Sequence, residues 1–347
     1  MHTLKAPLLA LALITPLCFG TVAATNSRQV TADNFVRAES DKFFSRVVAR
    51  GGFGKFVHNR ELVPADTQVV IRPNRDTLYS SAVFDLDAGP VTVELPDAGQ
   101  RYFSLMAINE DQYTQPLMYN PGSYRFTRES IGTRYVLLGV RTLVNPASID
   151  DLQQAHALQD RIKVNQQGRA GQFDVPHWDQ ASLDAIRSTM LSLAATVPDS
   201  RGMFGRRGEI DPVRHFIGSA SAWGGNPAQD AYYLNITPPH NDGVLRYHLT
   251  VKDVPVDAFW SISVYNAAGY FERNPQNSYT LNNLTATHQS DGSIAVQFGG
   301  CEDGVSNCLP VTAGWNYTVR LYKPHASVLD GSWHFPEASP VVSSAGE

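Results

Sequence analysis

The sequence predicts a mainly β protein with helical insertions, built as two antiparallel β-sandwich or jelly-roll-like domains. Short segments with alternating apolar residues recur between residues 69 and 144, and a second set lies between residues 231 and 322. Gly and Pro residues separate these segments, which is typical of short strands joined by turns. The helical patterns lie outside the two sets and do not alternate with the strands, so a parallel α/β fold is not indicated.

The 347 residues are enough for two domains. We expect a signal peptide at 1–24, an N-terminal β domain with a leading helix at 25–146, a helical insertion and linker at 147–230, and a C-terminal β-sandwich at 231–347. The net charge is -5, and acidic and basic residues are mixed along the chain. Because no basic run exists, nucleic-acid binding is not predicted.

The N-terminus has the features of a signal peptide. His2 and Lys5 precede an apolar run at residues 8–19, and small residues precede Thr25. The run is too short to span a bilayer, and no later segment is long and apolar enough to predict a transmembrane helix. We therefore expect an exported protein, periplasmic or secreted after cleavage behind Ala24.

Cleavage would remove Cys18 and leave Cys301 and Cys308, which close a short polar loop. In an oxidising compartment such a pair favours a disulfide. Two thiolates could also bind a metal ion, but no second pair and no nearby histidine supports this alternative. A disulfide is predicted, and no metal site.

The first half is predicted to open with a helix over residues 34–57, for which Gly51-Gly52 is the stop signal. Residues 69–71 are expected to form a buried strand, and residues 78–86 form the next one after a polar bend. The period-two pattern then predicts four further strands, at residues 91–95, 101–108, 123–126 and 135–144.

Three helices are predicted between the two β sets, each with an N-cap residue. Ser148 opens a helix over residues 148–164, Asp179 opens a second, and Asp211-Pro212 opens a short third. The second β set then follows, with strands at residues 231–236, 245–251, 259–265, 279–281, 294–298 and 317–322.

The bend between the first two predicted strands is the leading candidate for a binding site. It contains Arg72, Asn74, Arg75 and Asp76, and Tyr79 follows on the strand. One interpretation is a simple turn, in which Asn74 or Asp76 bonds its own backbone and the arginines are solvated. The other is a polar cluster at the mouth of a sandwich, where the arginines attract an anionic or polyhydroxylated ligand and Asp76 orients them. Both remain open.

A second candidate pair is Asp211 and His215, four residues apart on the short helix. A buried Asp–His pair can act as a general base, but helix capping alone also explains Asp211. Three aromatic residues are candidates for the apolar walls of a ligand site, namely Trp223, Trp260 and Tyr265.

Two blocks of the sequence resemble the families catalogued as domains of unknown function 1254 and 1214. The first block runs from Arg72 to Val91, and Tyr102, Phe103 and Tyr113 also fit it. The second block runs from Ala258 to Tyr265 and is followed by matching residues at Asn274, Pro275, Tyr279, Val319 to Tyr322 and Leu329 to Trp333. Trp223-Gly224-Gly225 and Asp230-Ala231-Tyr232 are similar to the linking region. The resemblance implies two β-sandwich domains with helical insertions, often in exported bacterial proteins. It implies no activity, and it marks Asn74, Asp76, Tyr79, Trp260 and Tyr265 as positions to test.

Two hypotheses for function follow. The first is an exported protein that binds a polar, anionic small molecule in a cleft, with acid–base hydrolysis by Asp76, Asp211 or His215 as an extension. The second is an assembly protein that forms homo-oligomers without catalysis. No Gly-x-Ser-x-Gly elbow, zinc signature or dinucleotide-binding glycine motif occurs. The cofactor is therefore unknown, and whether the protein is an enzyme stays open.

Overall fold

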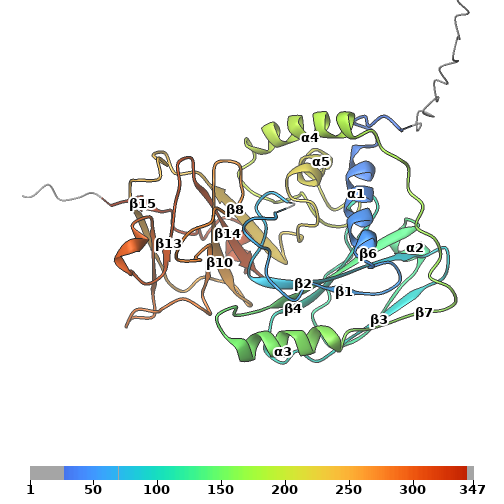
Figure 1. Cartoon of the computed structure of the whole chain (residues 1–347), viewed down its shortest axis with the longest axis horizontal. Helices are drawn as coiled ribbons and strands as arrows, with labels where there is room; N and C mark the ends of the chain where they lie inside the picture. Colours follow the sequence, from blue (N-terminus) through green and yellow to red (C-terminus); the bar gives the residue numbers. More distant parts are fainter. Residues whose placement is uncertain (1–26, 69, 342–347) are drawn as a thin grey trace, which may run out of the picture.

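Two β-sandwiches lie side by side and form most of the molecule (Figure 1). The computed structural model describes residues 27–68 and 70–341, so the predicted signal peptide lies outside the described residues. The strands form four sheets, and all named pairings except that between β12 and β13 are antiparallel. The predicted mainly β fold with helical insertions is confirmed.

The N-terminal sandwich packs a sheet of order β1-β2-β6-β4 on a smaller sheet of order β5-β3-β7. Its apolar core lies between the two sheets and includes Phe84, Val93, Leu105 and Val140. The strands are β1 (Val57–His58), β2 (Thr77–Asp85), β3 (Val91–Leu95), β4 (Phe103–Asn109), β5 (Gly122–Phe126), β6 (Tyr135–Leu143) and β7 (Lys163–Gln166).

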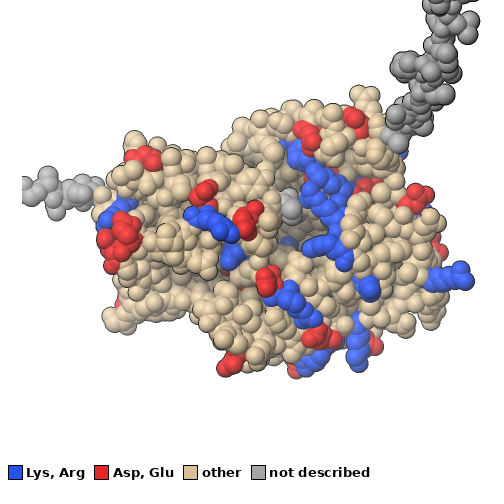
Figure 2. Space-filling model, in the orientation of Figure 1, with Lys and Arg blue, Asp and Glu red and all other residues tan. Residues whose placement is uncertain are grey.

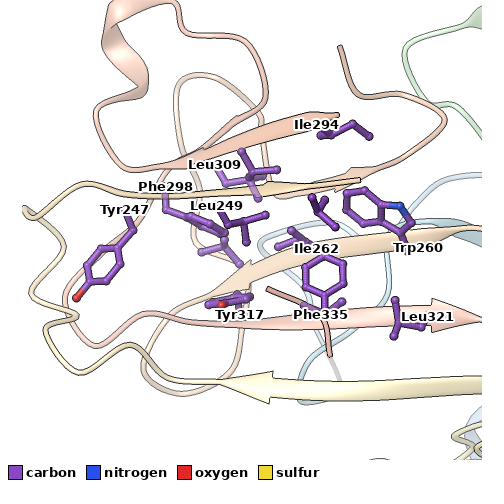
Figure 3. Packing of buried hydrophobic residues seen from close by; sticks show 14 of the residues in the cluster. Tyr247, Leu249, Trp260, Ile262, Ile294, Phe298, Leu309, Tyr317, Leu321 and Phe335 are labelled. Atoms are coloured by element: carbon purple, nitrogen blue, oxygen red, sulfur yellow. The ribbon is translucent and has the colours of Figure 1, made fainter. Parts of the chain in front are cut away.

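The C-terminal sandwich packs a sheet of order β11-β10-β14-β8 on one of order β13-β12-β9-β15. Figure 3 shows its core, where Trp260, Ile262, Leu249 and Phe335 meet between the sheets. The predicted disulfide between Cys301 and Cys308 is formed beside this core. The strands are β8 (Ala231–Ile236), β9 (Tyr247–Val251), β10 (Trp260–Tyr265), β11 (Thr280–Asn282), β12 (Ile294–Phe298), β13 (Cys308–Leu309), β14 (Asn316–Tyr322) and β15 (Ser339–Pro340).

A helical layer covers the outer face of the first N-terminal sheet (Figure 1). It consists of α1 (Phe35–Ala49), α4 (Gln180–Ala194) and α5 (Pro212–Ser221). Phe44 and Val47 of α1 pack on Val83 and Met106 of the sheet. The other helices are α2 (Arg128–Ile131), α3 (Ile149–Asp160) and α6 (Ala326–Leu329). None of the helices in the described part of the chain has the length and apolar character needed to span a bilayer.

The predicted helix caps are confirmed. The side chains of Ser148, Asp179 and Asp211 each accept a hydrogen bond from the backbone N–H of the third residue of the helix that follows. These interactions involve neighbours in the chain, so the residue types alone are sufficient to place them.

Three predicted boundaries are wrong. Residues 70 and 71 form no strand, because Arg72 adopts a left-handed conformation with φ of 49° and its N–H bonds the carbonyl of Gly269. The leading helix ends at Ala49, not at residue 57. The helix predicted over residues 148–164 ends at Asp160, and the chain then forms β7, which pairs with β3. Sheet pairing overrides the helical pattern there.

The two sandwiches repeat one strand order. The sheet segment β2-β6-β4 corresponds to β8-β14-β10, and β5-β3-β7 corresponds to β12-β9-β15. The corresponding strands also follow the same order along the chain, with α3 and α6 before the last strand of each set. The molecule therefore contains two copies of one architecture, to which α1, α4 and α5 are added.

Asp41 is a buried acid where the helical layer meets the sheet. Its side chain is only 2% exposed, and one carboxyl oxygen accepts a hydrogen bond from the indole N–H of Trp178 at 2.8 Å. Burial raises the pKa of Asp41 to about 7; Glu110 and Asp111 add to the shift, while the Trp178 bond and Arg37 oppose it. The folded protein therefore holds a proton here that the unfolded chain releases near pH 4.

This predicts a pH-dependent gain from Asp41→Asn. Because the folded-state pKa is raised, the ionised form favours unfolding, so wild-type stability is lost as pH rises from about 4 to about 7. Relative to wild type, the variant should gain roughly 3 kcal/mol in free energy of unfolding between these limits. Urea denaturation at pH 4 and pH 8 measures it. A constant difference between the two proteins would show that Asp41 ionises normally.

Candidate functional site

A cavity of about 840 Å³ lies between the two sandwiches and the helical layer. Its lining combines α1, the segment before α5 and the loop after it, the bend at residues 70–74, and strands β2, β6, β8 and β14. Figure 2 shows a hollow on this face of the molecule, with Lys and Arg side chains gathered along one side of it. The size is that of a pocket for a small organic molecule.

Each repeat has an arginine, a tyrosine and a serine at equivalent positions of the sheet that borders the cavity. In the first repeat, Arg141 on β6 lies opposite Tyr79 on β2 and Ser104 on β4. In the second repeat, Arg320 on β14 lies opposite Tyr233 on β8 and Ser261 on β10. Each arginine is thus the centre of a three-strand row on the sheet face that points away from its own sandwich core.

The bends that open the repeats also correspond. Both follow the pattern Pro-x-x-Asp-x-x-Tyr, with Asp76 in the first and Asp230 in the second. The backbone carbonyl of Asp76 accepts a hydrogen bond from the N–H of Val144, and that of Asp230 accepts one from the N–H of Lys323. In each case the donor lies three residues after the arginine of the row. The two rows and bends are therefore equivalent parts of one repeated unit.

Each arginine reaches across to the chain that opens the other repeat. Arg320 donates to the carbonyl of Arg72 at 2.9 Å and to that of Pro73 at 3.3 Å. Arg141 donates to the carbonyl of Gly224 at 2.7 Å. These crossed contacts, which we call the arginine clamps, join the halves through backbone carbonyls.

The guanidinium of Arg320 donates several hydrogen bonds within the protein. Besides the two carbonyls, it donates to the hydroxyl of Ser263 at 2.8 Å and to that of Tyr265 at 2.6 Å. Tyr265 in turn donates to the carbonyl of Pro73 at 2.7 Å. The side chain is only 4% exposed. Arg320 therefore holds structure and has little capacity for a ligand.

Arg141 makes far fewer contacts. The Gly224 carbonyl is its hydrogen-bond acceptor among the described residues, and its guanidinium lies 5.6 Å from the ring centroid of Tyr79. It lies deep in the protein yet keeps accessible surface, because it faces the cavity. Burial lowers the pKa of Arg141, but the phenolic oxygens of Tyr79, Tyr233 and Tyr322 outweigh this and raise it. The group is therefore a permanent cation.

The acidic side chains that line the cavity are already paired. Glu39 is bound by Arg187, and Asp199 is bound by Arg201 and Arg214. Within the described residues, the lining cations Lys42, Arg72, Arg141 and Arg320 form no ion pair with a carboxylate. The cavity therefore carries an uncompensated positive charge.

The remaining walls are polar on one side and aromatic on the other. The amide of Asn74 donates to the Tyr322 hydroxyl at 2.9 Å. Opposite, Trp223 stacks on Phe43 of α1 with centroids 4.3 Å apart and planes 8° apart. Gly224 has φ of 74°, which a residue with a Cβ rarely adopts, so the turn that carries the Arg141 acceptor favours glycine.

The predicted ligand-binding residues divide into two groups. Arg72, Asn74, Tyr79 and Trp223 line the cavity. The others lie elsewhere: Arg75 faces a separate open groove beside Tyr279, Trp260 is buried in the C-terminal core, and Tyr265 lies behind Arg320.

The predicted acid–base groups are not brought together. Asp76 is buried behind the cavity wall, where it accepts a hydrogen bond from the Ser261 hydroxyl at 2.6 Å. Burial raises its pKa, against the effect of Arg320. Asp211 caps α5. His215 stacks on Tyr113, and its Nδ1 lies near the backbone carbonyl of Met203 and its Nε2 near that of Asp111. None of the three lines the cavity.

Sequence reasoning missed Arg141, Arg320, Tyr233 and Tyr322. The internal repeat was the available signal. Beside the two Pro-x-x-Asp-x-x-Tyr bends, the chain contains Tyr102-Phe103-Ser104 and Phe259-Trp260-Ser261, each followed by an asparagine five residues after the serine. These asparagines, Asn109 and Asn266, cap equivalent turns with their side chains.

No group of three or more His, Cys, Asp or Glu side chains that could hold a metal ion occurs across residues 27–68 and 70–341. The site is thus defined by arginine, tyrosine and aromatic side chains between two repeated sandwiches.

Comparison with known proteins matches one stretch in each half of the chain to a family model. Residues 53–128 match the model described as Protein of unknown function (DUF1254), and residues 238–326 match Protein of unknown function (DUF1214). The chain therefore carries these two domains in tandem, and the resemblance seen in the sequence is confirmed. A search of curated proteins gives no match.

Solved structures share the fold. The VPA0106 protein from Vibrio parahaemolyticus is similar with a TM-score of 0.68 at 18% identity, over 90% of this chain and 98% of that chain. An uncharacterized protein from Burkholderia cenocepacia has a TM-score of 0.50 at 13% identity, over 84% of this chain and 83% of that chain. At these identities the similarity describes the fold alone.

Because Arg320 donates more hydrogen bonds than Arg141, we expect the replacement of Arg320 to destabilise the protein more. Arg320→Met removes the hydrogen bonds that the guanidinium donates to two carbonyls and two hydroxyls, and the Arg72 carbonyl loses its guanidinium donor, so the substitution should lower the free energy of unfolding by roughly 3–5 kcal/mol. Arg141→Met removes one such bond and an uncompensated charge, so it should cost at most about 1 kcal/mol. Urea denaturation of both variants measures the difference. Equal losses would contradict the assignment of Arg320 to structure and Arg141 to a ligand.

Proposed function

We propose that this protein binds a small organic anion in the cavity between its two sandwiches, with Arg141 as the main contact. The observation that carries the proposal is a deep guanidinium that faces an open space and pairs with no carboxylate among the described residues. Its equivalent in the other repeat, Arg320, satisfies two carbonyls and two hydroxyls.

The energetics support an anionic ligand. Holding a cation away from bulk water is costly unless it is paired or hydrogen-bonded, and one carbonyl offsets only part of that cost. A bound carboxylate could accept two parallel hydrogen bonds from the free side of the guanidinium. Tyr79 and Tyr233 lie close to Arg141, line the cavity with part of their surface exposed, and offer hydroxyl groups to the same ligand.

Charge around the opening favours the same kind of ligand. Lys42, Arg46 and Arg187 belong to the lining on the side of the helical layer, where Figure 2 shows basic side chains beside the hollow. Basic side chains outnumber acidic ones in the lining, and such an excess of positive charge attracts anions and raises their rate of entry. We therefore expect anion affinity to fall as ionic strength rises.

The proposal covers binding and does not extend to hydrolysis. Asp76, Asp211 and His215 lie outside the lining of the cavity, so none is in position to exchange a proton with a molecule bound there. We also propose export of the protein, which the disulfide between Cys301 and Cys308 supports because such bonds persist in oxidising compartments.

A thermal-shift panel of the chain from Thr25 onward tests the proposed function. The probes are acetate, benzoate, citrate and inorganic phosphate, with the neutral amide benzamide as the uncharged match for benzoate. An anion at about 100 times its dissociation constant should add about 2.7 kcal/mol to the free energy of unfolding and raise the melting temperature. We expect this for at least one organic anion and not for benzamide.

Arg141→Met should weaken binding of the responding anion at least about tenfold, the loss of roughly one charge-assisted hydrogen bond. The matched control is Arg125→Met, which removes an exposed arginine of β5 outside the cavity and should leave the affinity unchanged. If no anion raises the melting temperature, or if both variants behave alike, the proposed site is wrong. A concentration-dependent mass in sedimentation would then favour the assembly hypothesis.

A further inference from the structure

We propose that the natural ligand is a monocarboxylic acid with an apolar, ring-sized or larger body, which lies against the stacked pair Phe43 and Trp223 while its carboxylate meets Arg141. This inference rests on the proposed function and narrows it to one class of ligand. It follows from three features of the cavity: the aromatic pair in its wall, the further apolar side chains of its lining, and the accessible guanidinium of Arg141.

The aromatic pair lines the same cavity as Arg141. The guanidinium is held by the carbonyl of Gly224, and Trp223 is the preceding residue in the chain. The indole is fixed in place, because it stacks on Phe43, meets Phe44 edge to face at 6.2 Å and donates to the hydroxyl of Ser40 at 3.1 Å. Trp223 and Phe43 keep part of their surface exposed to the cavity, so a ligand ring can cover them.

Further apolar side chains line the cavity. Leu191, Ala194 and Val197, in and just after α4, line the cavity together with Met203. Covering these side chains removes apolar surface from water, which favours binding in proportion to the area covered. The volume of about 840 Å³ exceeds what a carboxylate alone would fill, so a substantial body is accommodated.

We assign the carboxylate to Arg141, which keeps accessible surface toward the cavity and forms no ion pair among the described residues. Arg320 is used by its clamp, and Arg72 donates from its Nη2 to Asn316. One guanidinium beside the hydroxyl groups of Tyr79 and Tyr233 matches a carboxylate, which carries one charge and two acceptor oxygens. A phosphate monoester carries up to two charges, so its second charge would have to be met by another lining cation such as Arg72.

Isothermal titration of the same chain separates these features. The probes are 3-phenylpropanoate, its neutral amide, acetate and phenyl phosphate. Covering one phenyl group should make 3-phenylpropanoate bind at least about tenfold more tightly than acetate. Loss of the charge should make the amide bind at least about tenfold more weakly than the acid. Phenyl phosphate should bind more weakly than 3-phenylpropanoate.

Variants of the aromatic wall give the second readout. Trp223→Ala should lower the affinity for 3-phenylpropanoate at least about fivefold and leave the affinity for acetate unchanged. Trp223→Phe keeps an aromatic ring, so it should retain most of the affinity for 3-phenylpropanoate. Trp333→Ala removes a tryptophan outside the cavity and should have no effect. If Trp223→Ala fails to fold by circular dichroism, Phe43→Leu replaces it, with the same expected loss.

The results distinguish this inference from the proposed function. If acetate and 3-phenylpropanoate bind with equal affinity and the Trp223 variants have no effect, the ligand has no apolar body that contacts this wall. Anion binding at Arg141 would still stand. Tighter binding of phenyl phosphate would overturn the assignment to a carboxylate. If Arg141→Met changes the affinity of none of the anions, the proposed function fails and this inference fails with it.

Discussion

The reciprocal arginine clamps are the contacts on which the arrangement of the two halves depends. Each clamp joins the central strand of one sandwich to the backbone that opens the other, so neither sheet can shift without breaking buried hydrogen bonds. Tyr102, Phe259 and Tyr322 pack between the clamps, with the rings of Phe259 and Tyr322 4.1 Å apart. At this junction, apolar packing stabilises the contact between the halves, and the polar contacts hold their relative position.

The two repeats differ in how the space in front of the central arginine is filled. Each repeat presents a polar row at the junction, and polar groups buried there need hydrogen-bond partners. In the second repeat, the bend at Arg72 and Pro73 fills the space before Arg320. In the first repeat, Gly224 approaches Arg141 from one side only, and α1 and α5 stand farther out as walls. Of the two equivalent arginines, Arg320 is thus held by its contacts across the junction, and Arg141 faces the cavity.

Much of the fold follows from local patterns. Alternating residues in β3, β9 and β12 and the caps at Ser148, Asp179 and Asp211 act over a few residues, so their identity is sufficient to predict them. The weak strand β7 has no such pattern and exists because β3 offers it an edge. The bend at Arg72 borders the cavity, but its side chains lie in different places: Asn74 lines the cavity, Arg75 lines another groove, and Asp76 lies in the interior.

By itself, the sequence determined the β class, the approximate strands, the helix caps and the pairing of Cys301 with Cys308, because each depends on neighbours in the chain or on a choice among very few partners. Only the tertiary structure decided which charged groups face an open space. Arg141 and Arg320 have the same preceding valine and equivalent strand positions. Their different roles arise from residues more than 80 and more than 240 positions away, Gly224 and the bend at Arg72, whose approach is set by three-dimensional packing.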